Sequence, residues 1–200
     1  MTDYEYPLTM TGGHTRQELL ALMHKRLDQP RLDHCLRVEE TSRKLAKRFG
    51  VNVDEAGLAG LLHDYAKQVD PADFEAVIKQ QGLDPELLNY NRGIWHGLVG
   101  VWFIQKEVGV SDPAVLQAIQ RHTTGDPRMT DLDMITFVAD FIEPARKLDV
   151  QAEARKAAKT SLTAATLIEL QSTLSYLIEK KAWVYPLTLA SYNALIAKVK

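Results

Sequence analysis

The stretch Leu58-Ala59-Gly60-Leu61-Leu62-His63-Asp64-Tyr65-Ala66-Lys67 places three polar side chains at the end of an apolar run. The segment from Glu55 to about Ala66 is apolar almost all round, which is typical of a central, buried helix. An unpaired buried charge costs several kcal/mol, so His63, Asp64 and Lys67 need partners there. If the helix continues to Lys67, the three side chains share one face. A divalent metal is one partner that suits imidazole and carboxylate together.

Helix signals recur along nearly the whole chain. Thr15 and Glu18 form a capping box before a periodic apolar run that stops at Pro30, and Asp54 is the expected cap of the helix from Glu55. Three Asp-Pro pairs predict further helix starts: Asp70-Pro71, Asp84-Pro85 and Asp112-Pro113. Other helices are expected over about residues 32–49, 95–108, 113–121, 132–146, 150–161, 163–180 and 186–200. With no alternating strand pattern, the sequence predicts an all-α fold, with a flexible tail over residues 1–13 and one domain over residues 14–200.

The composition limits the class of protein. The 200 residues are 46% hydrophobic, enough for a real core, and the 24 basic and 26 acidic side chains leave a net charge of -2. Such a chain is not disordered and has no broadly basic surface for nucleic acid. The single Cys35 excludes an internal disulfide, and no apolar run reaches the roughly 18 residues that span a membrane. We expect a cytoplasmic protein without nucleic-acid or membrane partners.

Further candidate ligands lie outside the quoted stretch. His34 follows Leu32-Asp33, and Asp140 interrupts an apolar run over residues 135–142. Each alone has an ordinary alternative, since a buried Asp can cap a helix and a lone His can be a hydrogen-bonded core residue. His96 and His122 fall at expected helix boundaries, where the alternative is an exposed loop histidine. His14 and His24 have no comparable neighbours and are expected at the surface.

The order His34, His63-Asp64, Asp140 resembles the HD-domain superfamily of metal-dependent phosphohydrolases. Longer strings resemble one branch, the YqeK family of symmetrical bis(5'-nucleosyl)-tetraphosphatases: His122-Thr123-Thr124-Gly125, residues 139–146 (ADFIEPAR) and Tyr185-Pro186-Leu187-Thr188. The resemblance runs from about Thr15 to the C-terminus, although Met134 stands where many relatives have Lys. It implies a compact HD-domain helical bundle that cleaves diadenosine tetraphosphate into two ADP.

The resemblance also implies roles for individual residues. One metal would be held by His34, His63, Asp64 and Asp140, and a second by His96 and His122 with Asp64 bridging. The implied metal is iron, with manganese, cobalt or zinc as alternatives, as one or two ions. The implied catalytic residues are Asp64, Lys67, His96 and His122. Substrate binding is implied for Arg31, His34, His96, His122, Thr123, Arg146, Tyr185, Pro186 and Thr188.

These residue types suit attack on a polyphosphate. A metal would polarise a phosphoryl oxygen and activate water, while Lys67 and Arg146 would offset phosphate charge. Lys67 could instead extend to solvent from a helix end, and Arg146 could be an ordinary cation near a helix C-terminus. Glu143 is expected to orient Arg146 through a salt bridge.

Several alternatives stay open at this point. Another HD-type activity would act on a guanosine alarmone, a nucleoside monophosphate or a cyclic nucleotide, and a non-catalytic nucleotide-sensing protein would keep the metal cage. The aromatic side chains of Trp95, Trp102 and Phe103 could stack on adenine, but their spacing favours the core. Apolar residues near the C-terminus allow a homodimer or a core contact: Leu189, Tyr192, Leu195 and Ile196. Finally, Gly57 and Gly60 lack a P-loop pattern and favour close helix packing, and Cys35 is expected to be a small core residue.

Overall fold

Short polar side chains begin most of the helices, as the local signals predict. The computed structural model describes residues 4–199. Thr15 and Glu18 form the expected capping box, and Asp70 and Asp112 accept backbone N–H groups of the turns that follow them. Within residues 4–199 the chain forms eleven α-helices and one 3-10 helix: α1 (Arg16–Arg26), α2 (Gln29–Phe49), α3 (Val53–Leu62), α4 (Pro71–Gln80), η1 (Pro85–Asn89), α5 (Arg92–Leu98), α6 (Gly100–Glu107), α7 (Pro113–Arg121), α8 (Asp131–Ile142), α9 (Asp149–Ala157), α10 (Leu162–Glu179) and α11 (Pro186–Val199).

The described residues contain no strand, and the predicted all-α class is confirmed. Some expected boundaries are wrong. The cap of α3 is Asn52 rather than Asp54, and α3 ends at Leu62, so His63 and Asp64 lie in the turns beyond it. The expected helix over residues 95–108 is divided into α5 and α6 at Val99.

Two other segments also differ from the prediction. The Asp84-Pro85 pair begins only a short 3-10 helix, η1. The expected helix over residues 132–146 stops as α8 at Ile142, because Pro144 disfavours helical backbone at the residue before it.

Two glycines allow α2 and α3 to pack closely. A Cβ atom at Gly60 would lie 2.5 Å from Ser42 Oγ and 3.1 Å from the Val38 carbonyl oxygen. One at Gly57 would lie 2.8 Å from Arg43 Cγ, also on α2, and 2.8 Å from the Tyr6 hydroxyl oxygen. Close helix packing, predicted for both glycines, is therefore confirmed, and it fixes the helices that carry His34 and His63.

The segment before α1 packs on the domain. Tyr6 is buried, and its hydroxyl donates to Glu39 Oε1 at 2.6 Å. The guanidinium of Arg43 lies 3.9 Å from the centre of the Tyr4 ring. From residue 4 onward this segment is not the loose tail expected over residues 1–13, because the side chains of Tyr4 and Tyr6 anchor it to the domain. Residues 1–3 lie outside the described part of the chain, and the domain start at residue 14 stays a prediction.

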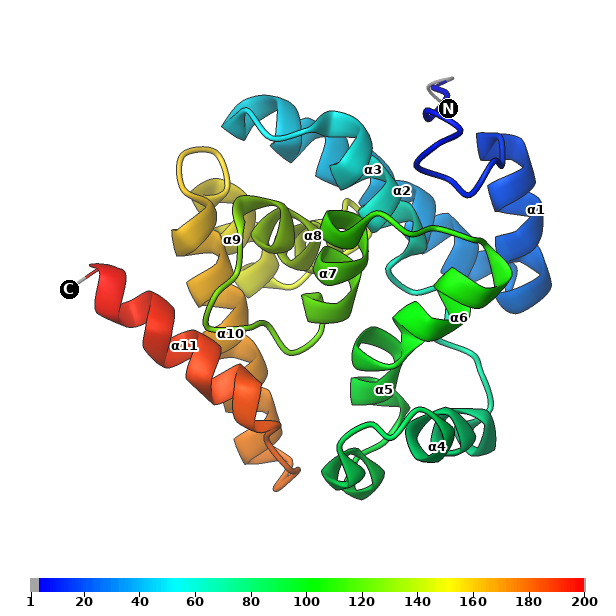
Figure 1. Cartoon of the computed structure of the whole chain (residues 1–200). Helices are drawn as coiled ribbons and strands as arrows, with labels where there is room; N and C mark the ends of the chain where they lie inside the picture. The colour runs from blue at the N-terminus through cyan, green and yellow to red at the C-terminus, as the bar shows by residue number, and fades with distance from the viewer. Residues whose placement is uncertain (1–3, 200) are drawn as a thin grey trace.

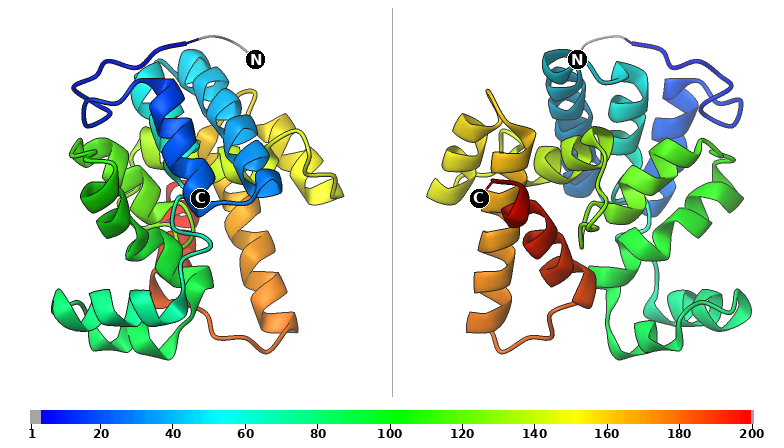
Figure 2. Two further views of the ribbon diagram at one scale, coloured as in Figure 1. Left: turned by 90° about the vertical axis from the view of Figure 1, so that its right-hand side faces the viewer. Right: turned by 60° about the vertical axis from the view of Figure 1, so that its left-hand side comes forward.

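Two arms extend below α1, α2 and α3 (Figure 1). The α4–α6 region lies on one side and α10–α11 on the other, and η1 and the α10–α11 loop lie at the same end of the molecule (Figures 1 and 2).

Cys35, Trp95 and Phe103 are buried in the core and Trp102 packs against it, as predicted. Leu195 is also buried, whereas Leu189 is half exposed. No helix within residues 4–199 is long and apolar enough to cross a membrane.

Candidate metal and substrate site

Four imidazoles and two carboxylates from separate helical segments meet at one point in the fold. His34 comes from α2 and Asp140 from α8, and His34 Nε2 lies 3.0 Å from Asp140 Oδ1. His63 follows α3, with its Nε2 3.9 Å from Asp140 Oδ1 and 3.5 Å from Asp64 Oδ2. Asp64 Oδ2 is also 3.8 Å from His34 Nε2. These four residues are candidate metal ligands, and we call them the first ligand group.

The other oxygen of Asp64 faces a second ligand group. Its Oδ1 lies 3.3 Å from Nε2 of His96, in α5, and 3.9 Å from Nε2 of His122, at the end of α7. The two Nε2 atoms are 3.0 Å apart. Lys67 Nζ is 3.4 Å from Asp64 Oδ1 and 3.0 Å from His96 Nε2. Asp64 therefore stands between two sets of donors, one for each carboxylate oxygen.

Hydrogen bonds fix which imidazole nitrogen faces inward. The Nδ1 atoms of His63, His96 and His122 lie 2.8, 2.7 and 2.6 Å from backbone carbonyl oxygens. A carbonyl only accepts, so each Nδ1 donates and each Nε2 faces the centre, where it can bind a metal through its lone pair. The Nε2 atoms of His96 and His122 face each other at 3.0 Å. The donors beside them are Lys67 Nζ, 3.0 Å from His96 Nε2, and the Thr123 hydroxyl, 3.1 Å from both.

The donor set fits a divalent metal. Within residues 4–199, His34 Nε2, His63 Nε2 and Asp64 Oδ1 are buried without a hydrogen-bond partner, a costly state that a metal would relieve. Three overlapping triads have ligand atoms within 4.8 Å of one another: His34, His63 and Asp64; His63, His122 and Asp140; and Asp64, His96 and His122. Mixed imidazole and carboxylate donors suit a transition metal.

The buried and charged groups of the cluster shift one another's pKa values. Burial acts to raise the pKa of Asp64, but His63, His96 and Lys67 outweigh it and hold that pKa well below its usual range. Burial and the nearby His96 and His63 lower the pKa of His122, which keeps its ring neutral. Burial also opposes the charged form of His63, yet Asp64 and Asp140 raise its pKa overall. The carboxylates are therefore ionised at neutral pH.

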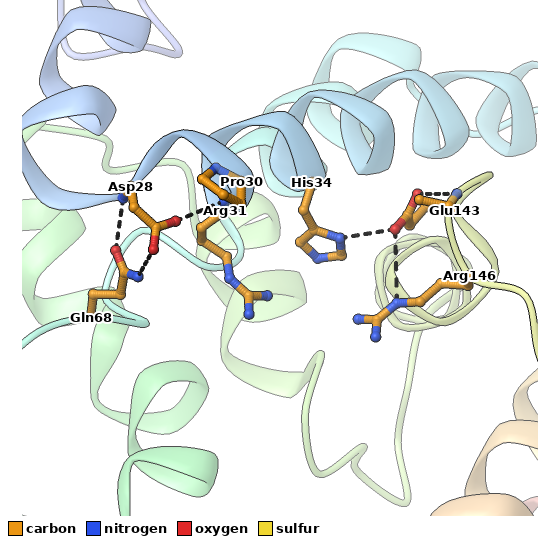
Figure 3. A pocket seen from close by; sticks show the side chains of 8 residues that line it. Asp28, Pro30, Arg31, His34, Gln68, Glu143 and Arg146 are labelled. Atoms are coloured by element: carbon orange, nitrogen blue, oxygen red, sulfur yellow. Dashed lines mark hydrogen bonds and ion pairs between the residues drawn. The ribbon is translucent and has the colours of Figure 1, made fainter.

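A pocket with two guanidinium groups, and with Asp28 and Glu143 also in its lining, opens on the first ligand group; we call it the cationic pocket. It has a volume of about 340 Å³, and Arg31, His34 and Arg146 are among the residues that line it. Arg31 Nη1 lies 2.8 Å from Asp64 Oδ2, and Arg146 Nη2 lies 3.1 Å from Asp140 Oδ1. Figure 3 shows the two guanidinium groups on either side of the His34 ring. The pocket can therefore take phosphate next to the carboxylates.

The family model described as HD domain matches residues 31–145, more than half of the chain. This chain belongs to the HD domain family. Proteins named symmetrical bis(5'-nucleosyl)-tetraphosphatase are similar to it: the Bacillus subtilis protein is 37% identical over 91% of this chain and 98% of its own length, and that of Halalkalibacterium halodurans is 38% identical over 92% and 99%. These relatives confirm the resemblance to the YqeK family.

A solved structure supports the same fold. The crystal structure of a predicted HD superfamily hydrolase involved in NAD metabolism, from Clostridium acetobutylicum, superposes with a TM-score of 0.86 at 33% identity. The match covers 91% of this chain and 97% of that one. The compact HD-domain helical bundle predicted from the sequence is thus confirmed.

Within this HD domain, Glu143 has a different main partner from the one expected. Its carboxylate accepts from Arg37 Nε at 2.7 Å and from the Ala145 N–H at 2.7 Å, and it lies 3.3 Å from His34 Nδ1. Arg146 Nε is farther, at 3.9 Å. Burial acts to raise the pKa of Glu143, but the hydrogen bonds from Arg37, the Ala145 N–H and His34 outweigh it and hold that pKa below its usual range. Glu143 is therefore held by Arg37, and it lies closer to His34 than to Arg146, so orienting His34 is its main role at the site.

Two contributors to the site have no local sequence signal. Arg37, one helical turn after His34, anchors Glu143. Arg155, from α9, donates to the carbonyl oxygens of Ile142, Glu143 and Arg146 and so fixes the turn after α8. Only the folded chain reveals these contacts, because their partners lie on other elements.

The other predicted residues divide into two locations. Thr123 lies at the cluster, with its Oγ1 3.1 Å from Nε2 of both His96 and His122. Lys67 also reaches the cluster, but from the turns after α3 and not from a continued helix. Tyr185 and Thr188 instead line a separate pocket that Thr123 also lines. Pro186 is exposed at the start of α11, outside the lining of that pocket. His24 is exposed and His14 partly exposed, as expected for surface residues.

Proposed function

We propose that this HD-domain protein hydrolyses dinucleoside tetraphosphates symmetrically, converting diadenosine tetraphosphate into two ADP. The observation that carries the proposal is the position of Asp64, whose two oxygens face two groups of metal-ligating side chains beside the cationic pocket. The relatives that span almost the whole chain and have this activity in their names support the choice of substrate.

The proposed ligands are His34, His63, Asp64 and Asp140 for one divalent metal, with His96 and His122 sharing Asp64 toward a second. Iron is the proposed metal, and manganese, cobalt and zinc suit the same donors. When bound, such a metal polarises a phosphoryl oxygen and lowers the pKa of coordinated water.

The side chains around the cluster supply the rest of the chemistry. Arg31 and Arg146 bind the phosphate chain from the cationic pocket, where a guanidinium can contact two phosphate oxygens at once. Asp64 orients the attacking water, and Lys67, beside His96, offsets negative charge that develops on the phosphoryl oxygens. Thr123, His96 and His122 lie together on the Oδ1 side of Asp64 and supply further polar groups for the phosphate chain.

The bond changes account for a symmetrical product. The water oxygen forms a bond to one of the two inner phosphorus atoms, and the bond from that phosphorus to the central bridging oxygen breaks. The electron pair leaves with the bridging oxygen on the second ADP. The attacking water releases its protons to bulk solvent through groups of the cluster, and no covalent intermediate with the protein is required.

The test is a product analysis with metal-loaded protein. Diadenosine tetraphosphate incubated with the iron- or cobalt-loaded protein should give ADP alone on anion-exchange chromatography. ATP with AMP would refute symmetrical cleavage. Faster turnover of a guanosine alarmone, a nucleoside monophosphate or a cyclic nucleotide would assign another HD activity. Tight ADP binding without turnover would instead identify a nucleotide-sensing protein.

Cellular location and assembly belong to the same proposal. A buried, lone Cys35 suits the reducing cytoplasm, and the half-exposed Leu189 offers apolar surface for a homodimer. Sedimentation of the purified protein tests the dimer, and the near-neutral charge predicts no retention on a nucleic-acid column.

A further inference from the structure

A second pocket adjoins the metal-ligand cluster on the side away from Arg31. Its volume is about 440 Å³, within the range of small-molecule sites. Asn89, Tyr90 and Asn91 line it from the end of η1, and Trp183 and Tyr185 line it from the α10–α11 loop. These two segments lie at the same end of the molecule (Figure 2).

The two pockets differ in charge. None of the described residues that line the second pocket is charged; they are aromatic, aliphatic, amide and hydroxyl side chains with one glycine. The first pocket is lined by Arg31, Arg146, His34 and two carboxylates. Phosphate groups therefore favour the first pocket and the cluster, whereas a neutral, flat and partly polar group favours the second.

The aromatic side chains form a group suited to a heterocycle. The ring of Tyr90 lies 4.9 Å from that of Tyr185 and 5.8 Å from that of Trp183, with interplanar angles of 78° and 84°. Trp183 is nevertheless 68% exposed, so a large flat surface faces the solvent. Stacking of a nucleobase on such a ring contributes about 1–3 kcal/mol. Asn89 and Asn91 add amide groups at the rim.

Thr123 connects this pocket to the reacting centre. It lines the pocket, and its hydroxyl oxygen is 3.1 Å from Nε2 of both His96 and His122. A nucleotide with its base among the aromatic rings can thus extend its phosphates past Thr123 to the cluster.

We propose that Tyr90 and Trp183 bind the nucleobase of one half of the dinucleotide, while the other half lies toward the cationic pocket. This inference rests on the proposed function and adds that two chemically equal halves occupy unequal sites. Tyr90 and Trp183 become specificity residues that recognise a nucleoside rather than phosphate.

The first experiment locates the base without requiring turnover. In the metal-loaded protein, ADP should protect the exposed Trp183 from fluorescence quenching by iodide, and pyrophosphate should not. The Trp183→Phe variant identifies how much emission comes from this residue, since Trp95 is buried and Trp102 partly so. Unchanged access of iodide to Trp183 at saturating ADP would overturn the proposal.

A second experiment measures the contribution of the rings. Trp183→Ala and Tyr90→Leu should weaken ADP binding at the affected site by about 5- to 150-fold, the range for loss of one base stack, and leave pyrophosphate affinity unchanged. Tyr176→Ala is the matched control, because Tyr176 is an exposed aromatic on α10 outside this pocket. ADP affinity equal to that of the unmodified protein, or an equal loss for pyrophosphate, would contradict the assignment.

Turnover then separates this inference from the proposed function. Trp183→Ala should lower kcat/KM for diadenosine tetraphosphate but leave that for inorganic tetraphosphate unchanged. If the unmodified protein forms no ADP from the dinucleotide, the proposed function fails, while the iodide and binding measurements still decide whether the pocket holds a base.

Discussion

The substitution Glu143→Gln tests how the protein orients a metal ligand. The change keeps the size of the side chain and removes its charge. Glu143 accepts from Arg37 Nε and the Ala145 N–H, both at 2.7 Å, and faces His34 Nδ1 at 3.3 Å. An amide keeps one acceptor oxygen, so its NH2 group must face a donor, either Arg37 or His34.

The expected magnitude follows from these contacts. A hydrogen bond to a charged group contributes about 1.5–3 kcal/mol. Loss of the group that orients a metal-ligating His typically lowers metal affinity about 10- to 100-fold, which equals about 1.4–2.7 kcal/mol. We therefore expect a 10- to 100-fold weaker metal site and a modest loss of stability in the metal-free protein.

The assay is competition for metal against a chelator of known affinity, with urea unfolding of the metal-free protein beside it. Glu39→Gln is the matched control, because Glu39 is also a buried carboxylate held by an arginine, Arg16, and contacts Tyr6 instead of an imidazole. This control should lose stability and keep its metal affinity. Unchanged metal affinity in Glu143→Gln, or an equal decrease in Glu39→Gln, would refute the orienting role.

Four further substitutions test the cluster, the packing and the pH dependence. His63→Ala and Asp140→Ala should each lose bound metal and most activity; full metal content by elemental analysis would contradict the ligand assignment. Gly60→Ala should lower the free energy of unfolding in urea despite a helix-propensity gain of about 1 kcal/mol, because overpacking against Ser42 costs about 1–3 kcal/mol. Burial and Glu107 raise the pKa of Tyr65 to about 12, so the stability that its neutral hydroxyl provides is complete below about pH 10 and is lost as pH rises toward 12. Urea titrations of Tyr65→Phe should show a smaller decline across that interval, and an equal decline would exclude this contribution.

The helix starts were predictable because their signals are local. The Asp-Pro pairs at Asp70 and Asp112 cap helices through their own side chains. Helix ends were harder, since α3 stops where His63 turns into the cluster and its Nδ1 bonds the Gly60 carbonyl. Pro144 does signal the end of α8. The prediction instead followed the apolar periodicity of the run and extended the helix past this residue.

The site was predictable as a set of residues and not as an arrangement. The order of His34, His63, Asp64 and Asp140 along the chain suggested a common centre. The resemblance also implied that Asp64 bridges toward His96 and His122. It did not say which carboxylate oxygen faces which group, because that depends on where α5 and α7 place these histidines. Arg155 and Trp183 were missed because each contacts another element, Arg155 the turn after α8 and Trp183 the ring of Tyr90 after η1.

The spread of the ligands along the chain has a consequence for the order of folding events. His34 and Glu143, which contact each other, are 109 positions apart, and the cluster also needs residues from the ends of α3 and α7. No short fragment or early helical hairpin can therefore bring all six donors together. During refolding, binding of cobalt should follow the recovery of helical circular dichroism as a separate, later phase. The absorption of bound cobalt would therefore report the rate at which distant helices dock.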